Sequence, residues 1–230
     1  MAGLSPKLVI FDCDGVLVDS EPLSIEVLIG VLGNAGVEMD AEEATELFLG
    51  KSLKTMSSIL HDEYGLAVDD RFLEEMRLDL YRRFRAELQP VPGIAAALDD
   101  LDLARCVASS SQPERIRLSL TITGLIDKLE PYIFSASMVE HGKPAPDLFL
   151  HAASQMGVAP AECIVIEDSP AGIQAAKAAG MRVFAFTGAS HAKTERHLTS
   201  LRQLSPDVLF DEMSDLIHFV RKEQRDGNTA

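Results

Sequence analysis

Two carboxylates, Asp12 and Asp14, stand at the end of a short apolar run in the segment KLVIFDCDGVLVDSEP. The run itself, Leu8–Phe11, is typical of a buried β-strand. Carboxylates are costly in apolar surroundings and repel each other, so a pair at this place indicates a site that uses negative charge. Such a pair can bind a cation, move a proton or act as a nucleophile.

Other polar side chains follow three further strand-like runs of the sequence. They are Ser109 after ARCVA, Lys143 after the YIFSAS region, and Glu167 and Asp168 after CIVI. The carboxyl ends of parallel strands meet at one edge of a sheet, which is where ligands bind in open α/β folds. We therefore expect these side chains to converge with the aspartate pair.

The acidic side chains of this group predict a metal site. The predicted ligands are Asp12, Asp14, Glu167 and Asp168. Brought into one crevice, they would repel one another strongly unless a cation lay among them. Oxygen ligands beside a site open to water favour Mg²⁺ over a soft metal. Ser169 and Pro170 fit the N-cap and first position of a following helix, which leaves Asp168 available as a ligand.

The hydroxyl and ammonium groups predict an anion site. Ser111 and Glu114 have capping-box spacing, so Ser111 is predicted to cap a helix. Ser109 lies two residues earlier, where its hydroxyl and nearby backbone N–H groups can hold an anion. Lys143 precedes a proline, which favours an extended loop, and it can neutralise the carboxylates and clamp a phosphate. His141 is predicted to lie at the surface.

Together these groups predict phosphoryl transfer. Carboxylates, Mg²⁺, a hydroxyl donor and a lysine act there mainly by positioning the phosphoryl group and neutralising its charge. One aspartate can attack phosphorus and form an aspartyl-phosphate, while the second transfers the proton.

The order of elements predicts a doubly wound, mostly parallel α/β sheet with an inserted helical bundle. Four segments with apolar residues at helical spacing follow the first strand, up to about residue 87. Strands and helices then alternate to the C-terminus, as parallel strands joined by right-handed crossovers do. The predicted domains are an α/β core of residues 1–17 and 89–230 and a helical domain of residues 18–88.

Composition restricts the partners and the compartment. The 230 residues carry a net charge of −15, which argues against nucleic acid and anionic membrane surfaces. No apolar run approaches the roughly 20 residues that cross a bilayer, and MAGLSPK does not resemble a secretory signal. Cys13, Cys106 and Cys163 are predicted to be buried free thiols, so we expect a cytoplasmic protein.

With these residues in place, the chain resembles the haloacid dehalogenase-like hydrolase superfamily, in the subgroup with a small helical cap after the first motif. FDCDGVLVDS, VASSS, GKPAPD and VIEDSPAG match its four motifs in order. The resemblance implies that Asp12 is the nucleophile and a metal ligand, and that Asp14 is the general acid/base with its backbone carbonyl on Mg²⁺. It also implies Ser109 as the phosphate-binding hydroxyl, Lys143 as the neutralising cation and Asp168 as the second carboxylate ligand.

The resemblance further implies a Mg²⁺-dependent phosphatase acting on a small phosphorylated metabolite, namely a sugar, polyol or sugar-acid phosphate. Glu167 is expected to reach the metal directly or through water. The predicted phosphate- and substrate-binding residues are Ser109, Ser110, Lys143, Gly50, Lys51 and Ser52. Lys51, Ser52 and Lys54, which follow Gly50, could meet a second anionic group of the substrate, and a solvated helix end is the alternative for them.

Departures from the family patterns exclude some of the reactions that the family catalyses. Asp14 is missing from true dehalogenases and from phosphonatases, so neither reaction is expected. β-Phosphoglucomutases carry a cap histidine and arginine where the nearest residues here are Ser24 and Leu53. A phosphatase is therefore favoured, with a mutase as the alternative. A receiver-like phospho-acceptor module without turnover is the alternative from another class, although such modules are much shorter and lack the helical insert. The oligomeric state is not defined by the sequence.

Overall fold

The computed structural model describes residues 4–48 and 53–227, and the chain divides into two compact units. Met1–Asp19 and Gln89–Ala230 form the first, which we call the core unit, and Ser20–Leu88 form the second, the helical unit. No helix in the described part of the chain is long and apolar enough to span a membrane. The role of the helical unit as a cap domain remains a prediction.

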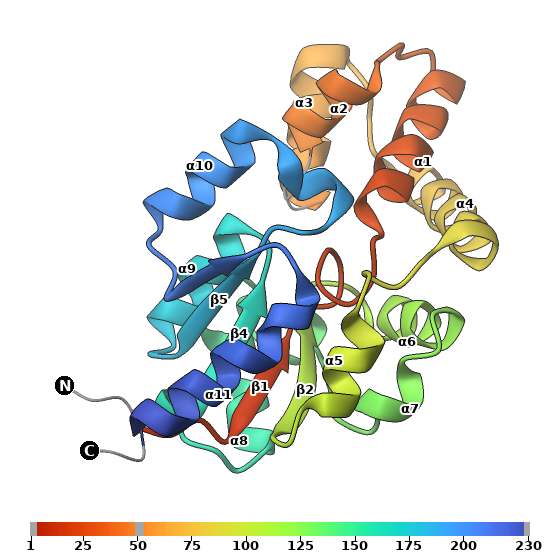
Figure 1. Cartoon of the computed structure of the whole chain (residues 1–230). Helices are drawn as coiled ribbons and strands as arrows, with labels where there is room; N and C mark the ends of the chain where they lie inside the picture. Colours follow the sequence, from red (N-terminus) through yellow and green to blue (C-terminus); the bar gives the residue numbers. More distant parts are fainter. Residues whose placement is uncertain (1–3, 49–52, 228–230) are drawn as a thin grey trace. The chain divides into compact units, whose positions relative to one another are not determined.

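The described strands of the core unit form one six-stranded parallel sheet (Figure 1). They are β1 (Leu8–Phe11), β2 (Ala104–Ser109), β3 (Ile133–Ser135), β4 (Cys163–Glu167), β5 (Arg182–Phe186) and β6 (Val208–Phe210). Their order is β3-β2-β1-β4-β5-β6, so the chain moves outward in both directions from β1 and β4. This is the doubly wound α/β sheet that the sequence predicts, and the crevice at which its order reverses lies between β1 and β4.

Helices cover both faces of this sheet. They are α5 (Ile94–Asp100), α6 (Pro113–Ile122), α7 (Ile126–Leu129), α8 (Asp147–Gln155), α9 (Pro170–Ala178), α10 (Glu195–Gln203) and α11 (Leu216–Gly227). α8 and α9 contact each other on one face of the sheet, and α5 and α11 contact each other on the opposite face (Figure 1). The sequence patterns do not predict α7 and α10.

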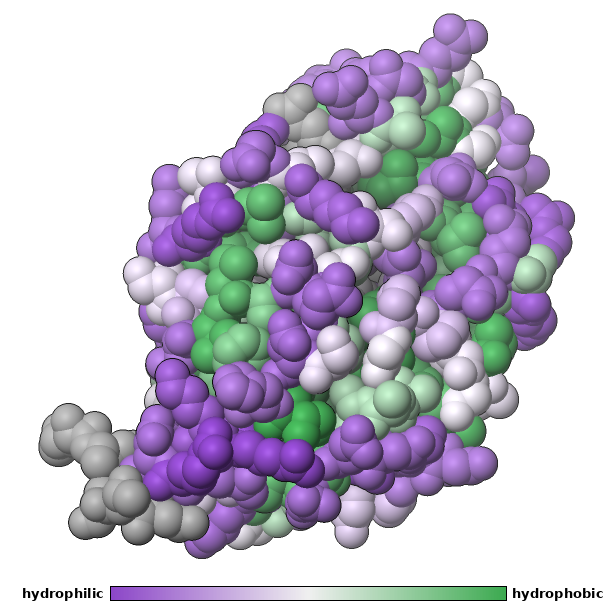
Figure 2. All heavy atoms as spheres, in the orientation of Figure 1, coloured by the Kyte–Doolittle hydropathy of each residue, from purple (hydrophilic) through white to green (hydrophobic). Residues whose placement is uncertain are grey.

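The central strands are buried on both faces, as parallel strands between two helical layers are. Leu8 and Ile10 of β1 join the apolar cluster beneath α8 and α9, while Val9 and Phe11, which alternate with them, are also fully buried. α11 is amphipathic. Leu216 and Val220 are buried, whereas Figure 2 shows a hydrophilic outer surface along this helix. The packing fixes the strand ends that carry the polar side chains.

The helical unit contains the helices predicted from apolar spacing. They are α1 (Glu21–Asn34), α2 (Ala41–Phe48), α3 (Leu53–Tyr64) and α4 (Asp70–Glu87). The arginines of α4 include exposed ion pairs: Arg77 bonds Glu74 and Arg82 bonds Asp79, each at 2.8 Å. Exposed pairs of this kind contribute little stability, so the unit depends on its apolar contacts, above all between α1 and α4.

The chain leaves and re-enters the core unit at adjacent segments. The N–H of Asp19 donates to the carbonyl of Gln89 at 3.1 Å, and the N–H of Val91 donates to the carbonyl of Leu17 at 3.0 Å. Val18 forms an antiparallel bridge with Pro90 between these two bonds. The two connections to the helical unit are therefore hydrogen-bonded to each other within the core unit.

Candidate active site

The buried ammonium of Lys143 joins the ends of β1 and β4. β1 pairs with β4 so that Phe11 lies opposite Ile166, and the N–H of Asp12 donates to the carbonyl of Ile166 at 3.0 Å. Nζ of Lys143 donates to Oδ1 of Asp12 at 2.9 Å and to Oε1 of Glu167 at 2.6 Å. The lysine side chain is only 4% exposed. Residues that are far apart in the sequence therefore converge here, as parallel strand ends predict.

Glu167 is fixed on both carboxylate oxygens. While Oε1 accepts from Lys143, Oε2 accepts from the N–H groups of Asp168 and Ser169 and from the Ser169 hydroxyl, each at 2.9 Å. A Cβ on Gly172 would lie 1.8 Å from Oε1, so this turn of α9 needs glycine to admit the carboxylate. These contacts make Glu167 the partner that orients Lys143 and the start of α9.

Asp168 lies beside this cluster at the start of α9. As predicted, Ser169 is the N-cap of α9, with its hydroxyl accepting from the Gly172 N–H at 3.0 Å, and Pro170 occupies the first helical turn. One carboxylate oxygen each of Asp12, Glu167 and Asp168 lies within 4.8 Å of the other two, and all three residues are buried. The acidic group that the sequence predicts around a cation is therefore present for these three residues.

The charges in this group are not balanced. Burial raises the pKa of Asp12 well above its ordinary value; Lys143 lowers it, and the carboxylates of Glu167, Asp168 and Asp14 raise it further. Burial alone would lower the pKa of Lys143, but Asp12 and Glu167 outweigh it and raise that pKa. Three buried carboxyl groups therefore share one ammonium. A hard divalent cation with oxygen ligands fits this donor set.

Asp14 is held by residues on the other side of β1. Oδ2 of Asp14 accepts from the Ser111 hydroxyl at 2.7 Å, and Oδ1 accepts from the Arg115 guanidinium at 2.9 Å. The prediction that Ser111 caps a helix is wrong, because the N-cap of α6 is Gln112, which makes no side-chain capping bond. Ser111 bonds Asp14 instead, and Arg115, one turn into α6, completes the pair.

Ser109 closes β2 at the same edge of the sheet. Its side chain is buried and its Oγ accepts from the Ser111 N–H at 3.1 Å, so that its hydroxyl hydrogen can point to a bound oxygen. Ser110, which follows it, is exposed. The structure thus puts Ser109 at the strand end predicted for an anion site, next to the residues that hold Asp14.

Comparisons with known proteins show the family of the chain. A model of the haloacid dehalogenase-like hydrolase family matches residues 6–180. The chain belongs to this family. The 6-phosphogluconate phosphatase of Escherichia coli (strain K12) is 32% identical over 86% of this chain and 94% of that protein. The fructose-1-phosphate phosphatase YqaB of the same strain is 32% identical over 75% of this chain and 92% of its own length.

A solved structure in this family has the same fold over nearly the whole chain. It is a conserved haloacid dehalogenase-like protein of unknown function, ATU0790 from Agrobacterium tumefaciens str. C58, with 36% identity and a TM-score of 0.83 over 94% of this chain and 98% of that one. The predicted enzyme class, a hydrolase of this family acting on phosphate monoesters, is confirmed.

Several residues that contact Asp14 and Asp168 in the structure are not among those that the sequence predicts. Nε2 of His191 lies 2.9 Å from Oδ2 of Asp168, and Nε2 of His197 lies 2.8 Å from the carbonyl oxygen of Asp168. Arg115 bonds Asp14 as described above. The one sequence feature that points to the contact with Asp14 is the spacing of Ser111 and Arg115, which puts a hydroxyl and a guanidinium one helical turn apart. HAKTERH, which supplies both histidines, has no periodicity that predicts it.

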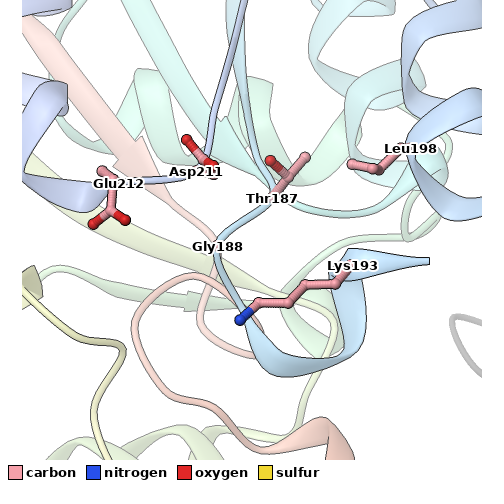
Figure 3. A pocket seen from close by; sticks show the side chains of 6 residues that line it. All are labelled: Thr187, Gly188, Lys193, Leu198, Asp211 and Glu212. Carbon is pink, nitrogen blue, oxygen red and sulfur yellow. The ribbon is translucent and has the colours of Figure 1, made fainter. Parts of the chain in front are cut away.

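A pocket of about 250 Å³ lies at the carboxyl ends of β5 and β6, on the ligand-binding edge of the sheet. Figure 3 shows its lining residues, which are Thr187, Gly188, Lys193, Leu198, Asp211 and Glu212. The predicted catalytic residues are not among them. The pocket wall carries charged groups of both signs, namely the Lys193 ammonium and the Asp211 and Glu212 carboxylates.

The remaining predictions concern residues away from these contacts. Gly50, Lys51 and Ser52 lie outside the described residues, so their predicted substrate contacts remain predictions. The three cysteines, Cys13, Cys106 and Cys163, are buried and free, as predicted. His141 lies at the surface, also as predicted, with Nδ1 3.2 Å from Oδ2 of Asp147.

Proposed function

We propose that this protein is a Mg²⁺-dependent phosphatase that works through an aspartyl-phosphate on Asp12. The observation that carries the proposal is the buried ion pair of Lys143 with Asp12 and Glu167, beside Asp168, at the strand ends where the sheet order reverses. Asp12, the backbone carbonyl of Asp14 and Asp168 would hold the cation, with Glu167 reaching it directly or through water. When bound, Mg²⁺ supplies charge neutralisation for the phosphoryl oxygens.

In the first half-reaction, a carboxylate oxygen of Asp12 attacks phosphorus. A bond forms between this oxygen and phosphorus, and the bond from phosphorus to the ester oxygen breaks. Asp14 gives its proton to the leaving oxygen, which departs as an alcohol. Lys143 neutralises Asp12 and the phosphoryl group as they approach, and Ser109 with Ser110 holds a phosphoryl oxygen.

In the second half-reaction, Asp14 takes a proton from water. The water oxygen bonds to phosphorus, and the bond between phosphorus and Asp12 breaks. Inorganic phosphate leaves, Asp12 is again a carboxylate and Asp14 is again protonated. Ser111 and Arg115 hold Asp14 in both steps, since each bonds one of its carboxylate oxygens.

The proposed substrates are small phosphorylated sugars, polyols or sugar acids. The names of the two relatives support this class, because 6-phosphogluconate is a phosphorylated sugar acid and fructose 1-phosphate is a sugar phosphate. The net charge of −15 supports a small metabolite over nucleic acid. The three buried free cysteines support a reducing compartment such as the cytoplasm.

A panel of phosphate esters tests the proposal. The panel should hold aldose, ketose, polyol and sugar-acid phosphates, each assayed for released phosphate with Mg²⁺ and again with EDTA. We expect turnover of at least one of these compounds with Mg²⁺, and its loss with EDTA, because the phosphoryl oxygens then lose the cation that neutralises their charge. Hydrolysis that persists in EDTA contradicts the proposed metal dependence, and no turnover across the panel contradicts the substrate class.

Two readouts of the same experiment separate the alternatives. A mutase converts a sugar 1-phosphate into the 6-phosphate when a trace of the bisphosphate is present, and releases little free phosphate. A phospho-acceptor module retains a long-lived phosphoryl group on Asp12 without turnover. Free phosphate in molar excess over the enzyme supports the phosphatase against both.

Arg115 offers a test of how Asp14 is positioned. Replacing Arg115 by Met is expected to lower kcat by up to roughly 10²-fold, because Asp14 loses the guanidinium that fixes one of its two carboxylate oxygens. The affinity for Mg²⁺ should change little, since Asp14 contributes its backbone to the proposed metal site. Arg117→Met is the matched control: Arg117 lies on the same helix, is 49% exposed and pairs with Glu130. An unchanged kcat in Arg115→Met contradicts the positioning role.

A further inference from the structure

The segment that follows β5 packs against the predicted metal ligand Asp168. It contains the turn η3 (Ser190–Lys193) and the first residues of α10. We propose that His191 is a positioning residue, which holds the carboxylate of Asp168 in the orientation that binds the catalytic cation. This inference rests on the proposed Mg²⁺-dependent function.

The contact between His191 and Asp168 is direct and excluded from solvent. Nε2 of His191 lies 2.9 Å from Oδ2 of Asp168, and the two side chains are 7% and 6% exposed. A carboxylate only accepts hydrogen bonds, so Nε2 carries the hydrogen. A buried hydrogen bond to a charged group restricts that group far more than an exposed one does. Asp168 therefore has a defined orientation before any cation arrives.

Gly15 completes this arrangement on the side of the first strand. Its φ is +78°, and a Cβ there would lie 2.0 Å from Oδ2 of Asp168 and 2.8 Å from Cε1 of His191. Both side chains thus occupy the space that a larger residue would fill. The glycine after the aspartate pair gives room for Asp168 and His191 as well as for a turn in the chain.

A second histidine holds the backbone of the same ligand. Nε2 of His197 donates to the carbonyl oxygen of Asp168 at 2.8 Å, and the rings of His191 and His197 meet edge to face at 5.6 Å. One short segment therefore contacts Asp168 at both its side chain and its main chain.

This segment is itself anchored within the core unit. The hydroxyl and the N–H of Ser190 both bond the carboxylate of Asp19, and Ala192 is fully buried. Before the turn, the Thr187 hydroxyl donates to the carbonyl of Phe210 at 3.1 Å. Since the residues on both sides of His191 are fixed, the imidazole can transmit that rigidity to Asp168. Residues that orient metal ligands in this way typically change metal affinity about 10–100-fold when removed.

Metal titration without substrate tests the inference. Mg²⁺ binding is measured by calorimetry, and Mn²⁺ binding by electron paramagnetic resonance, on the wild type and on His191→Ala, His191→Gln and His191→Asn. We expect affinity to fall by about 10–100-fold in His191→Ala. It should recover largely in His191→Gln, whose amide can donate from a position close to that of Nε2. The shorter amide of His191→Asn should not restore it.

The control is His218→Ala, since His218 is an exposed histidine on α11. Its metal affinity should equal that of the wild type, and circular dichroism should show that every variant compared is folded. If His191→Ala does not fold, the comparison of His191→Gln with His191→Asn decides. Unchanged or tighter metal binding in His191→Ala, or equal affinities in the Gln and Asn variants, overturns the inference.

The outcomes for the inference and for the proposed function are distinct. A metal affinity that depends on His191, in a wild type that hydrolyses no ester in the panel, contradicts the proposed substrate class and supports the positioning role. Normal metal-dependent hydrolysis, with a metal affinity that does not depend on His191, supports the proposed function and overturns the inference.

Discussion

Asp12→Asn is expected to abolish turnover, with kcat lower by at least about 10³-fold. An amide oxygen is a poor nucleophile toward phosphorus, so the aspartyl-phosphate cannot form at a useful rate. The measurement is phosphate release from the best substrate of the panel, together with acid-quench trapping of a phosphoryl-enzyme in the wild type. The trapped species should be missing from the variant.

The same substitution should leave the fold intact. In the metal-free protein the pKa of Asp12 is raised chiefly by burial, so its ionised form costs stability at neutral pH. A neutral amide removes this cost, and metal-free Asp12→Asn should unfold in urea no earlier than the metal-free wild type. Asp99→Asn, at an exposed residue paired with Lys128, is the control for activity and stability. Activity retained by Asp12→Asn would contradict the nucleophile assignment.

Lys143→Met is expected to lower both stability and activity. The substitution keeps an apolar chain against Phe149, whose ring centre lies 5.0 Å from Nζ, but it leaves two buried carboxylates without their cation. Removing one member of a buried ion pair typically costs about 3–5 kcal/mol. We therefore expect the metal-free free energy of unfolding to fall by about 3 kcal/mol at neutral pH, measured in urea. The loss should shrink in acid, where protonated carboxyls no longer repel each other.

The expected loss of kcat in Lys143→Met is roughly 10²–10³-fold, because the transferring phosphoryl group loses a fixed positive charge. Lys7→Met is the matched control: Lys7 is 64% exposed and pairs with Glu162 at the other end of the sheet. Its stability and activity should stay near those of the wild type. A Lys143→Met protein as stable and as active as this control would contradict the structural and the catalytic role of the lysine.

The sequence predicts the sheet and the meeting of its strand ends because both follow from local patterns. Apolar runs such as Leu8–Phe11 mark buried parallel strands, and the polar residue after each run must lie at one edge. Asp12, Lys143 and Glu167 therefore come together in the structure although the lysine is 131 residues from the aspartate. The strand order of the sheet is sufficient to predict that these three residues lie close together.

The remaining contacts depend on tertiary structure that no local pattern encodes. The capping prediction for Ser111 fails because Asp14, 97 residues away, offers a carboxylate to the hydroxyl. His191 and His197 lie in a part of the chain for which the patterns do not predict α10. Their partner, Asp168, meets them only once β4 and β5 pair. The helix-start rule did place Ser169 correctly, since its capping bond reaches only three residues along the chain.

The hydrogen bonds between the segments around Asp19 and Gln89 allow the inserted chain to vary without a change in the core unit. Because the two connections already lie side by side in the core unit, the core needs nothing of the inserted chain except that its ends meet. The entropy of closing a loop grows only slowly with its length, so a short turn or a whole folded insert can be accommodated there. This junction is thus a natural point for grafting: an insert from a relative can be exchanged here while the strand ends that carry out the chemistry stay in place.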